Sequence, residues 1–469
     1  MKLLSEEQIE TVDRTARRIL DEVGVKVLDE NVRDRLAAAG VPVQADERVR
    51  LEGPWLDARL QEAPCRFTLF SRDGKNDIAL GSGRCHFGNG GRVFQILDMA
   101  TQGFRPTLLR DVANTAALVD RLEFIRFYII ACQAHDLSPA HYHRNDFYQA
   151  FARTTKHVMG GVDSLEGARQ MHALAARIAG GEDTLREKPF VSVITNPISP
   201  LTLDGESLRI LEFCGRKGIP ATCAPAPISG ATAPATLAGT LAQLHAEALA
   251  GVALAQFLVP GTPVLYGAVA STMDLRTMNL AIGSVETAMI NTCSVDLAHR
   301  YGLPIYASAG ITDAMLPDIQ AGFEKGVSNL MLGMAGADFI HLAAGMLDSG
   351  NSIALEQYVI DNEILGMTER ILRGIRVSDG TLALEAIARV GPGGNYVTDE
   401  HTVENMFEEF FYPTLAVREQ YDRWTELGSP TPQTKAHDWV EDTLRRSELR
   451  LDAALVEDLR NRFPEIVDP

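Results

Sequence analysis

Cysteines are few in this sequence and show no regular spacing. The six cysteines are scattered over 469 residues without a CxxC pair, whereas thiolate zinc sites and disulfide frameworks place cysteines at short, regular intervals. Long hydrophobic runs are also absent, since no segment approaches the roughly 20 uncharged apolar residues that span a bilayer. The first residues mix charged and apolar side chains at helical spacing, which is typical of an amphipathic helix and not of a secretory signal. We therefore expect a soluble, cytoplasmic protein with no membrane partner.

Positive charge is scarce as well. The 44 lysines and arginines are outnumbered by 62 aspartates and glutamates, which gives a formal net charge of -18. Nucleic acids and anionic membranes are bound through basic surfaces, so neither is an expected partner. The composition, with 46% hydrophobic and 23% charged residues, is that of a folded globular protein. Small molecules and other proteins remain as the expected partners.

Nucleotide-binding and metal-binding motifs are missing. There is no GxxxxGK[ST] segment, and the glycine-rich segments 81–91 and 391–395 lack the GxGxxG spacing between a strand and a helix. Both therefore predict turns. His141 and His143 have the HxH spacing of barrel metallohydrolases, but they lie well past the nearest predicted strand, and the ends of the fifth and sixth predicted strands offer glycine and serine instead of further histidines. We expect no metal site.

The sequence does contain a repeated alternation of short apolar runs and helical stretches. This alternation is typical of βαβ units around a parallel sheet. With an eighth strand near 352–361, the spacing favours a (β/α)8 barrel over an open seven-stranded sheet, which stays as the alternative. The seven clear strands are predicted at 124–131, 156–161, 190–196, 219–225, 263–269, 304–310 and 338–344.

The predicted fold class is therefore α/β, a TIM-type (β/α)8 barrel with additions at both ends. An N-terminal α/β extension of helices and a hairpin covers residues 1–120, and the catalytic barrel covers 121–375. A C-terminal helical extension covers 376–469, and we interpret its last helix as a packing or oligomer-forming element.

Polar residues at the C-terminal ends of the barrel strands are the expected catalytic groups. Of these, Asp313 and His341 are the predicted catalytic residues, each at or just beyond a predicted strand. Aromatic residues accompany them at Phe87, Tyr266 and Tyr306. Packing in the core is the alternative role for these rings. If they face the barrel opening, they form a wall that holds a methylammonium group through cation–π contacts.

Several segments, in order along nearly the whole chain, carry a family resemblance. These are GNGGRVFQILDMATQGFRPTLLRDV, AEALAGVALAQFLVPGTPVLYG, MDLRTMNLAIGSVETAM, ITDAMLPDIQAGFEK and ALEQYVIDNEI. On them the chain resembles the trimethylamine methyltransferase (MttB-type) superfamily, which is related to methanogenesis. The resemblance implies a (β/α)8 methyltransferase that moves a methyl group from a methylated amine to Co(I) of a corrinoid (cobalamin). That corrinoid is supplied by a corrinoid-binding partner protein, so no cofactor is bound tightly, and a homo-oligomer is expected.

The trimethylamine-specific branch of this superfamily carries pyrrolysine in the barrel, and no non-standard residue is present here. The chain therefore resembles the non-pyrrolysine branch related to glycine betaine methyltransferase, which implies a quaternary amine as the methyl donor. Glycine betaine is the favoured substrate. Proline betaine, carnitine or trimethylamine, a folate acceptor, and a non-catalytic betaine-binding paralogue stay as alternatives.

Removing a methyl group from a quaternary nitrogen releases a neutral amine, so positioning and electrostatics suffice without a proton donor. The predicted substrate-binding donors for a carboxylate are Asn89 and Arg276, together with His341. Asp313 and Glu356 are the acidic residues expected beside the cation. A lyase or aldolase with a Schiff-base lysine is a further alternative, but Lys156 begins its strand and does not end it.

Overall fold

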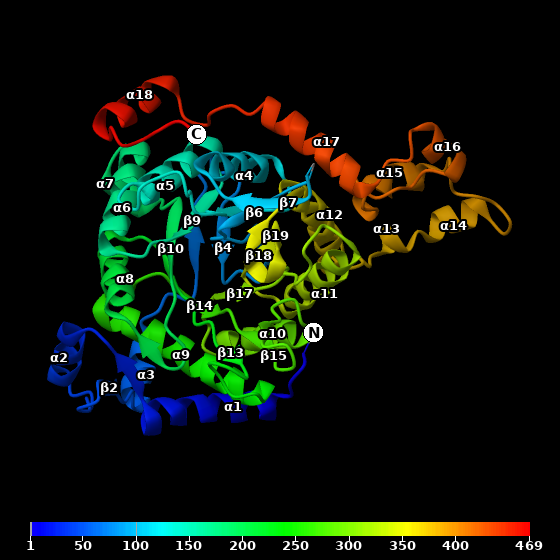
Figure 1. The fold of residues 1–469 in the computed structure, drawn as a ribbon. Helices are drawn as coiled ribbons and strands as arrows, with labels where there is room; N and C mark the ends of the chain where they lie inside the picture. The colour runs from blue at the N-terminus through cyan, green and yellow to red at the C-terminus, as the bar shows by residue number, and fades with distance from the viewer. Residues whose placement is uncertain (1, 100) are drawn as a thin grey trace.

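The computed structural model describes residues 2–99 and 101–469. Its centre is a closed barrel in which each strand pairs in parallel with its neighbours, and helices surround the strands on all sides (Figure 1). The predicted TIM-type (β/α)8 barrel is confirmed. In barrel order the strands are β10 (Val191–Thr195), β12 (Ala221–Cys223), β14 (Val264–Ala268), β17 (Ile305–Ser308), β18 (Phe339–Ala344), β5 (His86–Asn89), β8 (Phe127–Ile129) and β9 (His157–Gly161).

A helix follows each barrel strand along the chain. Side-chain N-caps such as Ser164 and Asp318 and left-handed C-caps such as Gly180 begin and end these helices. The helices are α4 (Leu109–Arg121), α5 (Tyr142–Arg153), α6 (Leu165–Ala179), α8 (Gly205–Lys217), α9 (Leu237–Leu258), α10 (Val285–Arg300), α11 (Ile319–Ala335) and α12 (Leu355–Leu372). By length and composition α9 could cross a membrane, but 94% of its apolar window is buried inside the protein, as in a core helix.

The predicted eighth strand near 352–361 is wrong. That segment begins with the short β20 (Ser352–Ile353) and continues as α12. The missing barrel strand is β5, which lies inside the predicted N-terminal extension, in the glycine-rich segment expected to form turns. A Cβ atom on Gly88 would lie 2.0 Å from the ring of Phe127, so the strand needs glycine there for a ring from β8 to cross it. The strand is difficult to predict from the sequence, because glycine has a low strand propensity.

The N-terminal residues cover one side and one end of the barrel. Helices α1 (Glu6–Arg18) and α3 (Gly53–Gln61) pack on α9. The hairpin of β3 (Phe67–Leu69) and β4 (Ile78–Leu80) closes the N-terminal end of the barrel, where its apolar side chains join the interior cluster of Phe127 and Phe339. Along the chain between α1 and α3 lie β1 (Val25–Val27) and β2 (Arg48–Val49), which form a small sheet with β11 (Thr202–Leu203), a strand that follows β10.

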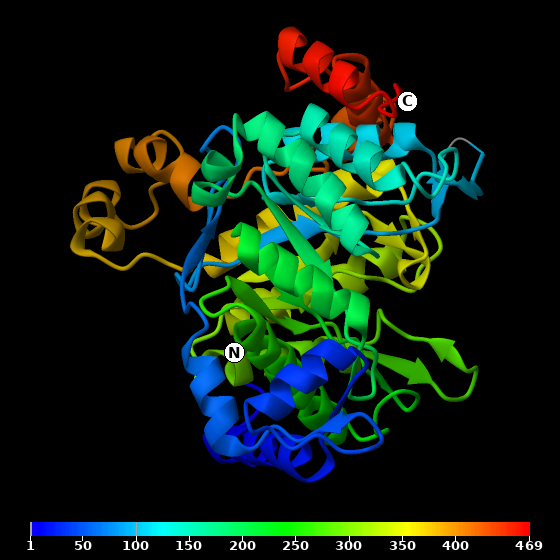
Figure 2. The ribbon, with the colours of Figure 1, turned by 90° about the vertical axis from the view of Figure 1, so that its left-hand side faces the viewer.

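Short strands and hairpins follow the barrel strands and surround the C-terminal ends, which we call the mouth. Figure 2 shows the hairpins β6–β7 and β15–β16 on the right, at the mouth, and α13 to α16 on the left. The elements around the mouth are β6 (Gln95–Asp98), β7 (Gly103–Pro106), β13 (Ile228–Ser229), β15 (Ser271–Asp274), β16 (Asn279–Leu280), β19 (Met346–Leu347) and β20.

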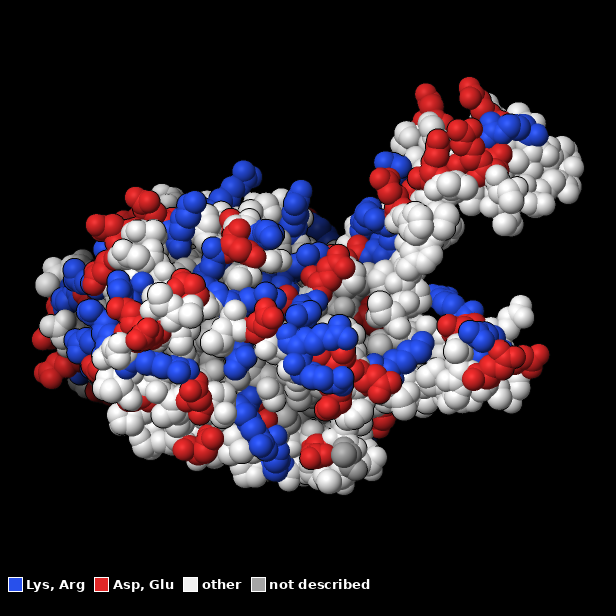
Figure 3. Space-filling model, turned by 90° about the horizontal axis from the view of Figure 1, so that it is seen from above, with Lys and Arg blue, Asp and Glu red and all other residues white. Residues whose placement is uncertain are grey.

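The C-terminal residues form a projecting arm and then return to the barrel. The arm consists of α13 (Asp379–Leu382), α14 (Leu384–Val390), α15 (Glu400–Glu409) and α16 (Tyr421–Glu426), and it extends away from the body in Figure 1. Helix α17 (Pro432–Arg445) packs on α12 and α4, and α18 (Ala453–Arg462) packs on α6. Viewed from above, basic and acidic side chains are mixed over the body (Figure 3).

Candidate active site at the strand ends

A stack of rings fills the barrel interior. The rings of Phe127 and Phe339 lie 3.6 Å apart between centroids, Phe339 and Tyr306 lie 5.5 Å apart, and Tyr306 and His341 lie 3.8 Å apart with an angle of 20° between their planes. Ser308 pairs with His341 in register, two residues nearer the C-terminal ends than the Tyr306–Phe339 pair. The stack therefore leads from the closed end of the barrel to His341 at the mouth.

His341 is buried and uncharged. Its Nε2 atom lies 2.6 Å from Ser308 Oγ, and only 3% of the residue is exposed. Burial holds the pKa of His341 well below its usual range, so the imidazole is neutral at physiological pH. A neutral imidazole can form hydrogen bonds without repelling a cationic ligand.

Two carboxylates lie just beyond the end of β17. Asp313 accepts hydrogen bonds from Ser349 Oγ at 2.8 Å and from the backbone N–H of Gly283 at 3.1 Å, so it joins loops that follow three barrel strands. Glu324 on α11 accepts from Thr312 Oγ1 at 2.5 Å and from the Asp313 N–H at 2.9 Å. Burial, and to a lesser extent the charge of Glu324, raises the pKa of Asp313. This side of the mouth favours a cation.

A positively charged side chain, that of Arg92, lies on another side of the mouth, just beyond the end of β5. Arg92 lies 4.7 Å from the centroid of the Tyr142 ring and 4.0 Å from the carboxylate of Asp163, which follows β9. Asp163 also accepts hydrogen bonds from Tyr142 and from His143 Nε2, the latter at 2.6 Å. Sequence reasoning missed Arg92, because it lies in the glycine-rich segment that predicted only a turn. Its position directly after a barrel strand becomes evident only when β5 is known.

Two predicted residues on β5 serve the fold. The side-chain amide of Asn89 donates to the carbonyls of Ile129 and Gly90, both at 2.7 Å, and accepts from the Ile129 N–H at 2.8 Å. These bonds join β5 to β8 and occupy the amide that was expected to bind a carboxylate. Phe87 is fully buried, and its ring lies close to Gly333 of α11, so it faces the outer helices.

The expected aromatic wall does not form. The hydroxyl of Tyr266 lies 2.9 Å from His245 Nδ1 on α9, so this ring points outward. Among the predicted wall residues Phe87, Tyr266 and Tyr306, only Tyr306 faces the barrel interior. Its ring is stacked between His341 and Phe339, which covers both of its faces.

The remaining predicted residues lie apart from the interior stack. Arg276 is on the turn between β15 and β16, where its side chain is 89% exposed and pairs with Asp274 at 2.9 Å. Glu356 begins α12 and pairs with His437 Nδ1 of α17 at 2.8 Å. The structure therefore brings Tyr306 and His341 together, places Asp313 beside the same mouth, and uses Glu356 to attach the C-terminal helices.

Buried lysines have structural partners. The Nζ atom of Lys325 donates to the carbonyl of Gly310 at 2.6 Å and to Asp361 at 3.0 Å, and Asp361 accepts from the Gly345 N–H at 2.7 Å. Because Gly310 follows β17 and Gly345 follows β18, this ion pair fixes the two strand ends that carry Ser308 and His341. Lys156 donates to three backbone carbonyls at 2.6 to 2.7 Å near the start of β9 and lies far from the mouth.

No metal-binding cluster is found over residues 2–99 and 101–469: no three His, Cys, Asp or Glu side chains there are arranged to hold an ion. His143, half of the HxH pair, is already bonded to Asp163, and a Cβ atom on Gly167 would lie 2.5 Å from its ring. The side chains placed at the mouth include the carboxylates of Asp313 and Glu324, the guanidinium group of Arg92 and the neutral imidazole of His341.

Comparisons with known proteins show which family the sequence matches and which solved structure shares the fold. The family model described as trimethylamine methyltransferase (MTTB) matches residues 1–464. The chain is 32% identical to a glycine betaine methyltransferase of Desulfitobacterium hafniense (strain Y51), over 93% of this chain and 90% of that protein. It is also 32% identical to the trimethylamine methyltransferase MttB of Methanosarcina barkeri, over 98% of this chain and 94% of that protein. The monomethylamine methyltransferase MtmB of Methanosarcina barkeri shares the fold, with a TM-score of 0.55 and 11% identity over 94% of this chain and 88% of that one.

Proposed function

The chain belongs to the trimethylamine methyltransferase (MTTB) family of methyltransferases, and from this premise we propose that its methyl donor is a quaternary amine bearing a carboxylate, with glycine betaine favoured. The proposed acceptor is Co(I) of a corrinoid held on a separate protein. The proposed location is the cytoplasm; the burial of α9 inside the protein supports a soluble protein.

The observation that carries this proposal is the separation of opposite charges at the mouth. Asp313 and Glu324 lie beyond β17, and Arg92 lies beyond β5. In the barrel order only β18 separates these two strands. Two strand spacings amount to about 10 Å. A zwitterion with one methylene between its charges, in contact with a partner at each end, fills a gap of this size.

The proposed reaction breaks one C–N bond of the donor. The electron pair stays on nitrogen and gives a neutral tertiary amine, while the methyl group passes to Co(I), which supplies the two electrons of the new bond. No proton is transferred, which fits a mouth whose buried histidine is neutral. The carboxylates hold the ammonium group, because the faces of Tyr306 are covered by its neighbours.

The ring stack gives His341 a fixed orientation, and Ser308 holds its Nε2 edge. We assign His341 the role of orienting the donor so that one N-methyl group points out of the mouth. The corrinoid protein would dock over the mouth, between the hairpins β6–β7 and β15–β16 (Figure 2).

The test is a methyl-transfer assay with purified protein and reduced cobalamin, monitored by loss of the Co(I) absorbance. We expect turnover with glycine betaine and, at lower rates, with proline betaine or carnitine, because each presents a carboxylate. Trimethylamine should be a poor donor. Transfer to tetrahydrofolate without cobalamin would contradict the proposed acceptor, and binding of glycine betaine without transfer to either acceptor would identify a non-catalytic protein.

A further inference from the structure

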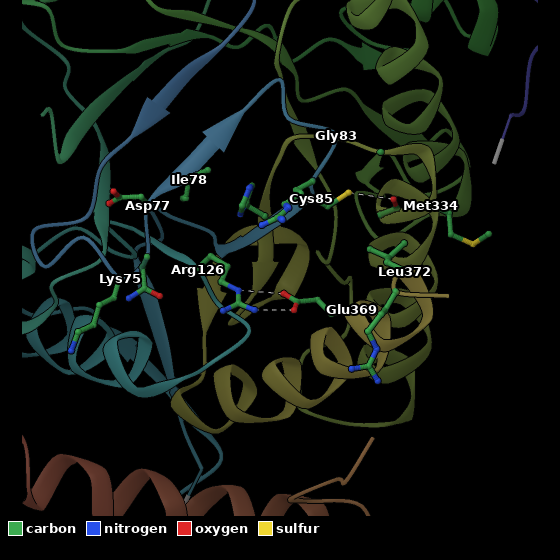
Figure 4. A pocket seen from close by; sticks show the side chains of 15 residues that line it. Lys75, Asp77, Ile78, Gly83, Cys85, Arg126, Met334, Glu369 and Leu372 are labelled. Carbon is green, nitrogen blue, oxygen red and sulfur yellow. Dashed lines mark hydrogen bonds and ion pairs between the residues drawn. The ribbon is translucent and has the colours of Figure 1, made fainter. Parts of the chain in front are cut away.

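A cavity lies at the end of the barrel opposite the mouth. It has a volume of about 710 Å³, within the range of small-molecule sites, and it opens between the β3–β4 turn, the starts of β5 and β8 and the ends of α11 and α12. We call it the floor pocket. Figure 4 shows Arg126 and Glu369 facing one another in its lining, with Lys75 to one side and Leu372 to the other. Its charged and polar lining includes Lys75, Arg84, His86, Arg126, Glu369 and Arg373.

The floor pocket is basic in an acidic protein. Its lining has four lysine and arginine side chains against the carboxylates of Asp77 and Glu369, although the whole chain has a net charge of -18. Both carboxylates are already engaged. Glu369 pairs with Arg126 at 2.9 Å, and Asp77 accepts from the Ser71 N–H at 2.8 Å and from its hydroxyl at 2.9 Å.

Two of the cations are available for a ligand. Within residues 2–99 and 101–469 the side chains of Lys75 and Arg84 form no hydrogen bond or ion pair, and both are exposed at the rim of the cavity. Arg373 donates one N–H to a backbone carbonyl and keeps the rest of its guanidinium group for other partners. Guanidinium and ammonium groups around one cavity match the oxygen atoms of an oxyanion.

His86 adds an unsatisfied polar atom to this lining. Its Nε2 atom is buried and has no hydrogen-bond partner in the described part of the chain. Burial and the nearby charge of Arg126 lower the pKa of His86 to about 4, so the ring is neutral. Buried polar atoms without partners are rare, and one that lines a cavity commonly bonds a ligand or a water molecule. On the other wall, a Cβ atom on Gly336 would meet nothing within 4 Å, so the cavity stays open there.

We propose that the floor pocket binds a small phosphate- or carboxylate-bearing anion, independently of the methyl donor at the mouth. Lys75 and Arg84 attract the anion, Arg126 and Arg373 contact its oxygen atoms, and His86 Nε2 bonds a polar atom of the ligand. The ring stack fills the barrel interior between the floor pocket and the mouth. Binding of the anion should therefore not depend on which methyl donor is bound at the mouth.

The test is isothermal titration calorimetry at low ionic strength with inorganic phosphate in one arm and citrate in the other. We expect saturable binding of at least one anion, and the arm that binds more tightly identifies the chemistry of the ligand. The double variant Lys75→Gln/Arg84→Gln should fold normally, because neither side chain has a partner, and should bind at least ten-fold more weakly. Arg276→Gln is the matched control, since it removes an exposed cation at the other end of the barrel, and it should bind like the wild type.

Hydrogen exchange locates the ligand. The anion should increase protection in residues 75–86 and 333–336, and excess glycine betaine should not displace it. The proposal is overturned if neither anion binds, if the double variant binds as tightly as Arg276→Gln, or if glycine betaine competes with the anion.

Discussion

The two ends of the barrel differ in the charged side chains that they present. At the mouth, carboxylates lie beyond β17 and a guanidinium group lies beyond β5, and the neutral His341 is on β18, between these two strands in the barrel order. At the closed end, a hairpin fills the barrel and leaves a basic cavity beside it. Active sites of TIM barrels lie at the C-terminal ends of the strands. Volume alone therefore does not locate the active site here, because a cavity of about 710 Å³ lies at the end of the barrel that does not carry the strand-end residues.

The largest expected effect concerns the ion pair that supports the mouth. Replacing Lys325 by Met leaves the fully buried Asp361 without its cationic partner, which should lower the free energy of unfolding by about 3–5 kcal/mol. Urea denaturation measures this loss. The double variant Lys325→Met/Asp361→Leu removes both charges and should recover much of the stability. An equal loss in the single and double variants would show that the pair is not the cause.

His341→Ala should abolish most activity while the protein stays folded. Removing the ring frees Ser308 and opens space above Tyr306, and the loss of a positioned group should lower kcat/KM about 100-fold. The methyl-transfer assay measures this effect. His86→Ala at the other end of the barrel should keep activity within about two-fold. If both variants lost activity equally, the distinction between the two ends would fail.

Gly88→Ala tests the ring stack that separates the two ends. The added methyl group would collide with the ring of Phe127, so we expect a loss of about 1–3 kcal/mol and a weakened near-ultraviolet circular dichroism signal from the stacked rings. Gly322→Ala in α11 is the control, because a Cβ atom there meets nothing within 4 Å and alanine favours a helix. A stable Gly88→Ala variant with an unchanged spectrum would contradict the described packing.

Arg92→Gln tests whether the guanidinium group beyond β5 binds the carboxylate of the methyl donor. Removing the guanidinium group should raise KM for glycine betaine about ten-fold, the effect of losing about 1.4 kcal/mol. The rate with trimethylamine, which has no carboxylate, should change little. Steady-state kinetics with both donors measures the ratio. A parallel loss for both donors would assign Arg92 to the fold or to docking of the acceptor protein.

The smallest expected effect is a pH dependence at the contact of α17 with α12. Glu356 holds the pKa of His437 above its ordinary value of 6.5. The stabilisation is therefore fully present below about pH 6.5 and is lost as the pH rises through the raised pKa. Since this histidine is largely exposed, the effect should be under about 1 kcal/mol. Comparing the Tm of the wild type with that of His437→Gln between pH 6 and 8 measures it, and the difference should shrink as the pH rises.

The barrel could be predicted from sequence because seven of its strands are continuous apolar runs between helices. β5 could not, since its glycine is required by a ring from another strand, and that contact is visible only in three dimensions. Because β5 was not predicted, Arg92 was not recognised as a residue at a strand end. The direction of the strand side chains could not be predicted either. In a short strand buried on both faces, nothing in the sequence shows which alternate set points inward, so Tyr266 and Phe87 were assigned to a mouth that they do not face.

For polar residues, the sequence could predict a position at a strand end but not the hydrogen bonds that the side chain forms. His341 lies within a predicted apolar strand and Asp313 lies three residues beyond another, so the sequence could place both near the C-terminal ends of the strands. Asn89 also lies at a strand end, but its amide is used by the backbone of β8, and no sequence pattern reveals such a bond. The Lys325–Asp361 pair joins α11 to α12, and Asp361 lies in the segment that was predicted as the eighth strand, so the pair could not be recognised from the sequence.

The most direct test of the central claim is a structure of the protein with bound glycine betaine. We predict the ligand at the mouth, with its carboxylate against Arg92, its quaternary nitrogen toward Asp313 and one methyl group directed away from His341 to the outside. A ligand in the floor pocket, or at the mouth with its carboxylate away from Arg92, would contradict it.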